Sequence, residues 1–101
     1  MKNYFDFKKK TILISGSEGF LGEAIVKRIS PISKRLILID IHKKRKKNLN
    51  LKNIDYFQCD FSSNLEIENL IKKISYKYNK IDIIINNAAI TTNNKKSKNL
   101  I

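Results

Sequence analysis

The stretch from Thr11 to Gly22 constrains the fold of this chain more than any other. It reads Thr-Ile-Leu-Ile-Ser-Gly-Ser-Glu-Gly-Phe-Leu-Gly, an apolar run followed by three evenly spaced glycines. The pattern predicts a strand, a tight turn and the start of a helix. Each glycine removes a Cβ where one would be in the way: Gly16 can take the bend off the strand, Gly19 lets a pyrophosphate approach the backbone, and Gly22 lets the helix pack closely.

A second feature supports a nucleotide ligand for this turn. The free N–H groups and the positive dipole end of the predicted helix would face phosphates. A second apolar run, Leu36 to Ile39, ends in Asp40, 18 residues beyond Gly22. There a carboxylate can accept both hydroxyls of an adenosine ribose. We therefore expect a dinucleotide; the alternative is a glycine-rich turn that binds nothing.

The rest of the chain continues the alternation of strands and helices. Pro31 should end the first helix, whose apolar residues on one face are Leu21, Ile25, Val26 and Ile29. Ile54–Cys59 is expected to be a third strand. Ser63 and Glu66 form a capping box for a helix from about Asn64 to Tyr78, with apolar positions at Ile67, Leu70, Ile71, Ile74 and Tyr78.

The fourth strand is expected at Ile81–Ile85. Strands that alternate with helices imply right-handed βαβ units and a parallel sheet. We predict an α/β protein with a partial Rossmann (doubly wound) fold: one domain over residues 1–101, a four-stranded parallel sheet of order 3-2-1-4, and flanking helices. A complete dinucleotide fold needs two such mononucleotide-binding halves, more than 101 residues provide.

Charge and targeting signals add weaker constraints. Lys and Arg number 21 against 9 Asp and Glu. A basic module for RNA or DNA, using Lys43 to Lys47 and Lys95 to Lys98, is therefore an alternative. The lysines are spread along the whole chain, however, which favours a solvated surface over a nucleic-acid interface. The sequence shows no signal peptide and no run long enough to span a membrane, so we expect a cytoplasmic protein that does not enter the bilayer.

Neither Cys59 nor His42 predicts a metal site or a nucleophile. The single cysteine excludes an internal disulfide. It follows an apolar strand, so a buried and inert thiol is the favoured interpretation. His42 has no cluster of metal ligands around it and is expected at the surface.

Four segments together resemble the amino-terminal half of the short-chain dehydrogenase/reductase family: Ser15 to Gly22, Asp40, Cys59-Asp60-Phe61 and Asn86-Asn87-Ala88-Ala89. The resemblance covers nearly the whole chain and implies an oxidoreductase that transfers hydride between NAD(P) and an alcohol or carbonyl. The cofactor-binding residues that it implies are Gly16, Ser17, Glu18, Gly19, Phe20, Leu21 and Gly22 for the pyrophosphate, Asp40 for the ribose, Asp60 and Phe61 beside the adenine, and Asn86, Asn87 and Ala88 at the sheet end.

The sequence also departs from the family pattern. Ser15 and Ala89 stand where the family usually has Thr and Gly. The glycine spacing resembles the extended, sugar-nucleotide-modifying branch, whereas the double asparagine resembles the single-domain branch, so the substrate class stays open. The double asparagine also argues against a third possibility, a methyltransferase-like half sheet that binds adenosyl-methionine.

The catalytic residues of the family are a Ser, a Tyr and a Lys four residues after the Tyr, all beyond the fourth strand. The resemblance therefore predicts a truncated chain with no catalytic residue, able to bind cofactor without catalysing. Tyr4 with Lys8 and Tyr76 with Lys80 have the spacing but lie outside the expected structural context.

Two further expectations concern the cofactor and partners. Lys43, Lys44 or Arg45 could reach the 2′-phosphate of NADP, but Asp40 would repel that phosphate, which favours NAD. The apolar fourth strand would be an exposed edge. We expect it to aggregate or to pair with a second copy or a complementing half.

Overall fold

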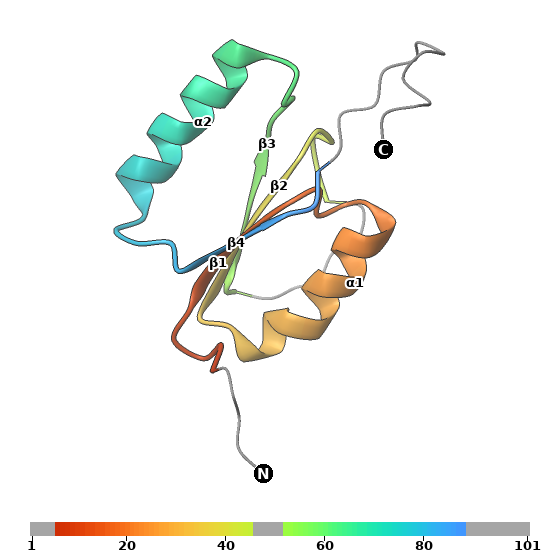
Figure 1. Ribbon diagram of the computed structural model, residues 1–101, viewed down its shortest axis with the longest axis vertical. Coiled ribbons are helices and arrows are strands. Elements are labelled where there is room, and N and C mark those ends of the chain that lie inside the picture. Colours follow the sequence, from red (N-terminus) through yellow and green to blue (C-terminus); the bar gives the residue numbers. More distant parts are fainter. Residues whose placement is uncertain (1–5, 46–51, 89–101) are drawn as a thin grey trace.

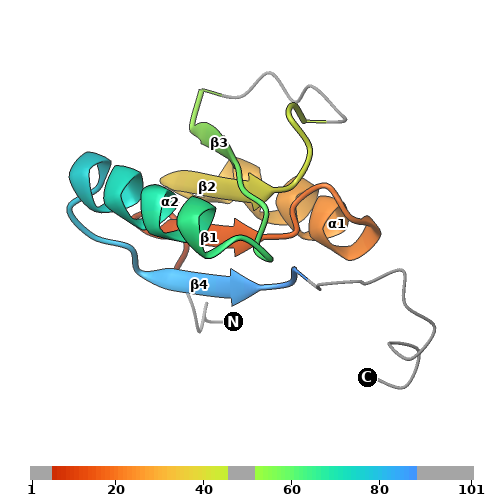
Figure 2. The ribbon, with the colours of Figure 1, turned by 90° about the horizontal axis from the view of Figure 1, so that it is seen from above.

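The computed structural model describes residues 6–45 and 52–88, which form a parallel sheet between two helices. The elements in chain order are β1 (Thr11–Ser15), α1 (Phe20–Ile29), a 3₁₀ turn (Ser30–Ile32), β2 (Arg35–Asp40), β3 (Ile54–Gln58), α2 (Asn64–Lys77) and β4 (Ile83–Asn86). The four strands are parallel in the order β3-β2-β1-β4 (Figure 2). This confirms the predicted fold class and strand order.

The two helices lie on opposite faces of the sheet (Figure 1). A strand covered on both faces should be apolar throughout, and in β2 the residues from Leu36 to Ile39 are at most 2% exposed. One cluster of buried residues, on the α1 face, holds Ile12, Ile14, Val26, Ile29, Leu36 and Leu38; a second, on the α2 face, holds Ile39, Cys59 and Leu70. The core therefore holds the carboxyl ends of β1 and β2 rigidly in place.

Two apolar residues of the helical patterns lie outside the core. Leu21 and Ile71 are each 58% exposed, although the spacing placed them on the buried faces. In α1 the first turn buries Gly22, about 100° around the helix from Leu21. In α2 the buried residue is Leu70, and Ile71 lies at the margin of that face.

The ends of the helices follow the predicted signals with one difference. Ile29 ends α1, and Pro31 lies in the 3₁₀ turn that follows. At α2 the Ser63 side chain accepts a hydrogen bond from the Glu66 N–H at 3.2 Å. The Glu66 carboxylate, however, accepts from the Asp60 N–H at 2.8 Å. The Glu66 side chain therefore ties the loop after β3 to the helix.

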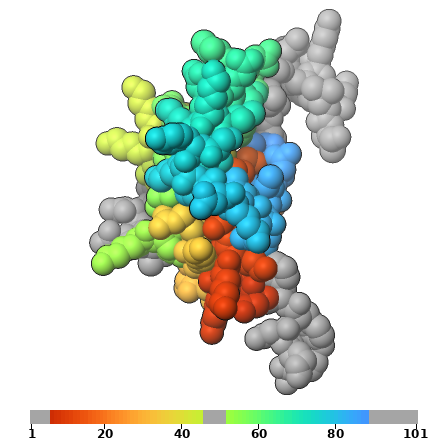
Figure 3. Space-filling model, turned by 90° about the vertical axis from the view of Figure 1, so that its left-hand side faces the viewer, coloured from red at the N-terminus to blue at the C-terminus, as the bar shows by residue number. Residues whose placement is uncertain are grey.

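β4 forms one edge of the sheet within the described part of the chain. It begins at Ile83, later than predicted. The residue before it, Asp82, is bound to Thr11 through both its side chain and its backbone. The Asp82 carboxylate accepts from the Thr11 N–H at 2.8 Å, and the Asp82 N–H donates to the Thr11 carbonyl at 2.8 Å. Figure 3 shows β4 alongside α2 rather than beneath it, and Ile84 is 67% exposed. Among the described residues, neither helix is long and apolar enough to cross a membrane.

Candidate functional site

The glycine turn between β1 and α1 has the geometry that its spacing predicts. Gly16 has φ of +72°, a conformation that L side chains rarely adopt. A Cβ on Gly16 would also lie 2.9 Å from the Cα of Ala88, and one on Gly22 would lie 2.0 Å from the Gly16 carbonyl oxygen. A Cβ on Gly19 would meet only that same oxygen, at 3.5 Å. Gly16 and Gly22 thus allow close packing within the protein, while the side of Gly19 stays open.

This turn leads directly into the amino terminus of α1. Gly19 is the N-cap residue, and no side chain caps the helix there. The N–H groups of a first helical turn have no intrahelical acceptor, and with the helix dipole they favour an anion. The end of β1 therefore presents a site suited to a phosphate group.

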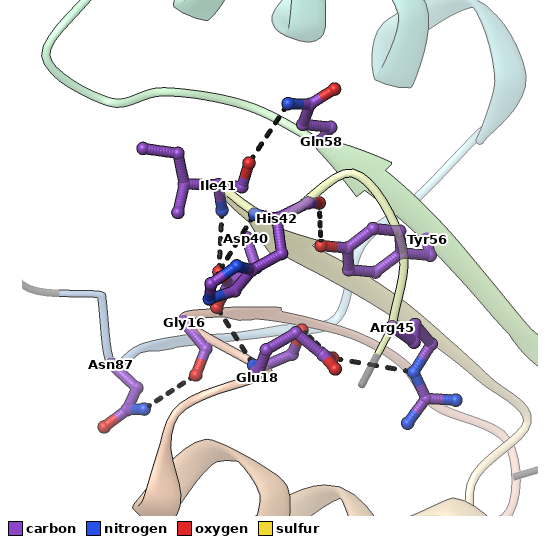
Figure 4. Close-up of polar contacts among 10 residues, drawn as sticks. Gly16, Glu18, Asp40, Ile41, His42, Arg45, Tyr56, Gln58 and Asn87 are labelled. Atoms are coloured by element: carbon purple, nitrogen blue, oxygen red, sulfur yellow. Dashed lines mark hydrogen bonds and ion pairs between the residues drawn. The ribbon is translucent and has the colours of Figure 1, made fainter. Parts of the chain in front are cut away.

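Asp40, the last residue of β2, is held next to the glycine turn. It is 8% exposed. One carboxylate oxygen accepts from the Glu18 N–H at 2.9 Å, and the other accepts from the Ile41 N–H at 2.7 Å. The imidazole Nε2 of His42 lies 3.7 Å from that second oxygen. Backbone hydrogen bonds thus fix the predicted ribose-binding carboxylate in one orientation (Figure 4).

The hydroxyl of Ser15 joins the end of β4 to the glycine turn. Its Oγ donates to the Asn86 side-chain oxygen at 2.9 Å and accepts from the N–H groups of Asn87 and Ala88 at 3.0 and 3.1 Å. The Asn87 amide group donates to the Gly16 carbonyl oxygen at 3.1 Å. These hydrogen bonds tie the end of β4 to the glycine turn.

The segment after β2 is tied to the edge strand β3. The Gln58 side chain donates to the Ile41 carbonyl at 3.1 Å, and the Tyr56 hydroxyl donates to the His42 carbonyl. Burial, together with the nearby carboxylates of Asp40 and Glu18, raises the pKa of Tyr56 to about 12. The phenol therefore stays protonated well into the alkaline range and keeps this hydrogen bond there.

The loop after β3 contributes Cys59, Asp60 and Ser62. Burial raises the pKa of the Cys59 thiol, and the nearby Glu66 and Asp60 raise it further. Cys59 is 1% exposed, which confirms the prediction of a buried thiol. The Asp60 carboxylate accepts from the hydroxyl of Ser62 at 2.7 Å and from its N–H at 2.9 Å, and these hydrogen bonds lower the pKa of Asp60.

These segments surround a cleft of about 610 Å³ at the carboxyl ends of the four strands. Nine predicted site residues line it: Gly16, Glu18, Gly19, Phe20, Asp40, Asp60, Phe61, Asn87 and Ala88. Four do not: Ser17 is 1% exposed, Gly22 packs on the turn, Asn86 bonds to Ser15, and Leu21 is largely exposed on α1. The cleft is also lined by Ile41, His42, Cys59 and Ser62, which the sequence motifs did not predict as site residues. Ile41 and His42 directly follow β2, and this place at a strand end is the signal that could have predicted them.

Other candidate groups lie away from this cleft or outside the described residues. Tyr76 is 95% exposed on α2 and does not line the cleft. Tyr4, Ala89 and the basic segments 46–47 and 95–98 fall outside the described residues. Over 6–45 and 52–88, no three His, Cys, Asp or Glu side chains form a group that could hold a metal ion.

Comparison with known proteins agrees with this geometry. A model of the short chain dehydrogenase family matches residues 10–100. An uncharacterized oxidoreductase of Saccharomyces cerevisiae is 38% identical over 82% of this chain and 27% of its own length. The 3-oxoacyl-[acyl-carrier-protein] reductase FabG of Rickettsia typhi is 34% identical over 86% of this chain and 36% of its own. The chain thus spans about a third of the length of these relatives.

Two solved structures with bound nicotinamide dinucleotide have the same fold. A short chain dehydrogenase from Leptospira borgpetersenii with bound NAD⁺ has a TM-score of 0.78 and 26% identity, over 91% of this chain and 36% of that one. A 4-hydroxyisoleucine dehydrogenase complexed with NADH has a TM-score of 0.70 and 29% identity, over 80% of this chain and 34% of that one. The glycine turn and the strand order agree with the family model that matches residues 10–100. The chain belongs to the short chain dehydrogenase family.

Proposed function

We propose that this chain binds a nicotinamide dinucleotide in the cleft at the carboxyl ends of its strands. It would form the cofactor-binding part of an oxidoreductase that transfers hydride between the dinucleotide and an alcohol or carbonyl substrate. One observation carries the proposal: the uncapped start of α1 and the oriented carboxylate of Asp40 line the same cleft. Two structurally similar proteins that hold NAD⁺ or NADH support it.

Each part of the cleft suits a different part of the ligand. The open side of Gly19 and the first turn of α1 would bind the pyrophosphate. Asp40 would accept hydrogen bonds from the adenosine ribose, and Asp60 and Phe61 would flank the adenine. Asn87 and Ala88 would border the cleft at the end of β4. The bound nicotinamide would supply the hydride chemistry, and the residues named above would hold the dinucleotide in the cleft.

NAD is the preferred cofactor in this proposal. Asp40 and Glu18 both line the cleft, and they are 8% and 7% exposed. Two poorly solvated carboxylates would repel a 2′-phosphate on the ribose, because charge repulsion strengthens as water is excluded. Over the described residues, the wall of the cleft includes no Lys or Arg whose positive charge could offset the negative charge of the 2′-phosphate of NADP.

The test is a fluorescence titration with NADH, which is practical because the chain contains no Trp. Asp40→Ala should weaken NADH binding by roughly tenfold or more, because hydrogen bonds to a charged group contribute about 1.5–3 kcal/mol. Glu68→Ala is the matched control: it removes one carboxylate from the exposed surface of α2. Equal weakening by both substitutions, or no NADH binding by the unmodified chain, would refute the proposal.

The open edge of β4 is proposed to pair with a further strand, from a second copy of the chain or from a complementing half. The exposed side chain of Ile84 and the absence of a described strand beyond β4 support this. Analytical ultracentrifugation should show self-association that Ile84→Lys reduces. A monomer at all concentrations, with a sharp thermal transition at high temperature, would rule the pairing out.

A further inference from the structure

A nearly buried ion pair joins the glycine turn to the segment after β2. The side chains of Glu18 and Arg45 are 3% and 15% exposed, and Arg45 Nε lies 3.6 Å from a Glu18 carboxylate oxygen. The same oxygen accepts a hydrogen bond from the Ser17 hydroxyl at 2.9 Å. Removing a charge pair from water costs free energy, which the pair recovers only if its geometry is good.

The geometry leaves Arg45 with unused hydrogen-bonding capacity. At 3.6 Å the contact to Glu18 is too long for a hydrogen bond. Arg45 Nε is also buried without a hydrogen-bond partner in the described part of the chain. A buried donor without an acceptor is energetically unfavourable. A guanidinium is well matched to the oxygens of a phosphate.

Glu18 connects this guanidinium to the cleft. The Glu18 N–H bonds to Asp40 at 2.9 Å, so the Glu18 backbone lies directly beside the proposed ribose site. Tyr56 and Gln58 hold the chain that leads to Arg45. Glu18 and Asp40 line the cleft, and Arg45 does not. Figure 4 shows the Glu18 side chain pointing toward Arg45.

We infer that Glu18 is a specificity-determining residue that restrains Arg45, a latent ligand for a 2′-phosphate. The carboxylate of Glu18 pairs with the guanidinium of Arg45 and adds a second negative charge near Asp40. A dinucleotide without the 2′-phosphate is then preferred for two reasons: the phosphate meets carboxylates, and the cation that could bind it is engaged. This inference rests on the proposed binding of a nicotinamide dinucleotide.

The experiment measures the ratio of the Kd for NADPH to the Kd for NADH by fluorescence. Glu18→Gln keeps an acceptor for the Ser17 hydroxyl but removes the charge, so the ratio should fall by roughly tenfold as Arg45 becomes available to the 2′-phosphate. In Glu18→Gln/Arg45→Met this fall should disappear. The gain in NADPH affinity should also weaken with added salt.

Arg45→Met alone provides a second test that does not depend on the folding of the Glu18 variant. It removes the positive charge of Arg45 from beside Glu18, so the ratio should rise by about threefold or more. If the ion pair had only a structural role, its loss would weaken the binding of both dinucleotides equally. The ratio of the two Kd values would then stay unchanged in every variant, which would overturn the inference. Absence of NADH binding by the unmodified chain would instead overturn the proposed function itself.

Discussion

The substitution Gly22→Ala tests whether the turn and the helix are packed as closely as the structure describes. In an ordinary helix interior this change stabilises by about 1 kcal/mol, because Ala has the higher helix propensity. Here the new Cβ would lie 2.0 Å from the carbonyl oxygen of Gly16, 2.9 Å from its carbonyl carbon and 3.0 Å from the Cα of Ser17. All three atoms belong to the backbone, so no side-chain rotation can relieve the contact.

The expected net effect is a loss of stability. Overpacking typically costs about 1–3 kcal/mol, and the upper end applies because α1 must move away from the turn. Offsetting about 3 kcal/mol with about 1 kcal/mol of helix propensity leaves about 2 kcal/mol of destabilisation. In a domain of this size that corresponds to a fall in melting temperature of about 10 °C.

The assay is urea denaturation followed by far-ultraviolet circular dichroism. Gly19→Ala is the matched control in the same turn, because its Cβ meets only one atom, at 3.5 Å; we expect it to cost less than about 1 kcal/mol. A Gly22→Ala variant as stable as the unmodified chain, or more stable, would show that the helix does not pack on the turn as described.

Three further predictions concern other contacts of the sheet. Ser15→Ala leaves two backbone N–H groups without their acceptor and should cost about 2 kcal/mol in urea denaturation; an unchanged midpoint would mean that this hydroxyl does not hold the end of β4. The hydrogen bond from the Thr11 N–H, with smaller effects from lysines, lowers the pKa of Asp82. The ionised form therefore stabilises the fold above the unfolded pKa of about 4, and this stability is lost as the pH falls through the lower folded pKa. The stability difference between the unmodified chain and Asp82→Asn should accordingly shrink below about pH 4; a constant difference would contradict the assignment. Cys59 should react slowly with a thiol reagent in the native state and quickly in denaturant, since it is 1% exposed; fast native labelling would argue against the described packing of α2.

The sequence predicted the backbone arrangement better than it predicted the side-chain contacts. Glycine spacing and apolar runs depend on local sterics and burial, so they were enough to predict the strand order and the conformations of Gly16 and Gly22. Periodicity alone could not show that Leu21 and Ile71 lie at the margins of the helix faces. Whether a side chain at the margin of a helix face is buried depends on how the helix is placed over the sheet.

Contacts between distant segments were also beyond the sequence pattern. The pairing of Glu18 with Arg45 joins two loops, and the Ser15 hydroxyl reaches across the sheet to β4. Arg45 belonged to the basic run proposed for a nucleic acid, yet its side chain turns inward. The exposed charge of that run is therefore smaller than its composition suggested, and the structure gives no support to that alternative.

Amide chemical-shift mapping tests the central claim, that the cleft at the strand ends binds a nicotinamide dinucleotide. Titration of the isotope-labelled chain with NAD⁺ should shift the signals of the glycine turn, of the residues after β2 and β3, and of Ala88, which together surround the cleft. Signals in the middle of α2 should stay in place. Shifts confined to α2 or to surface lysines, or no shifts at millimolar NAD⁺, would contradict the account.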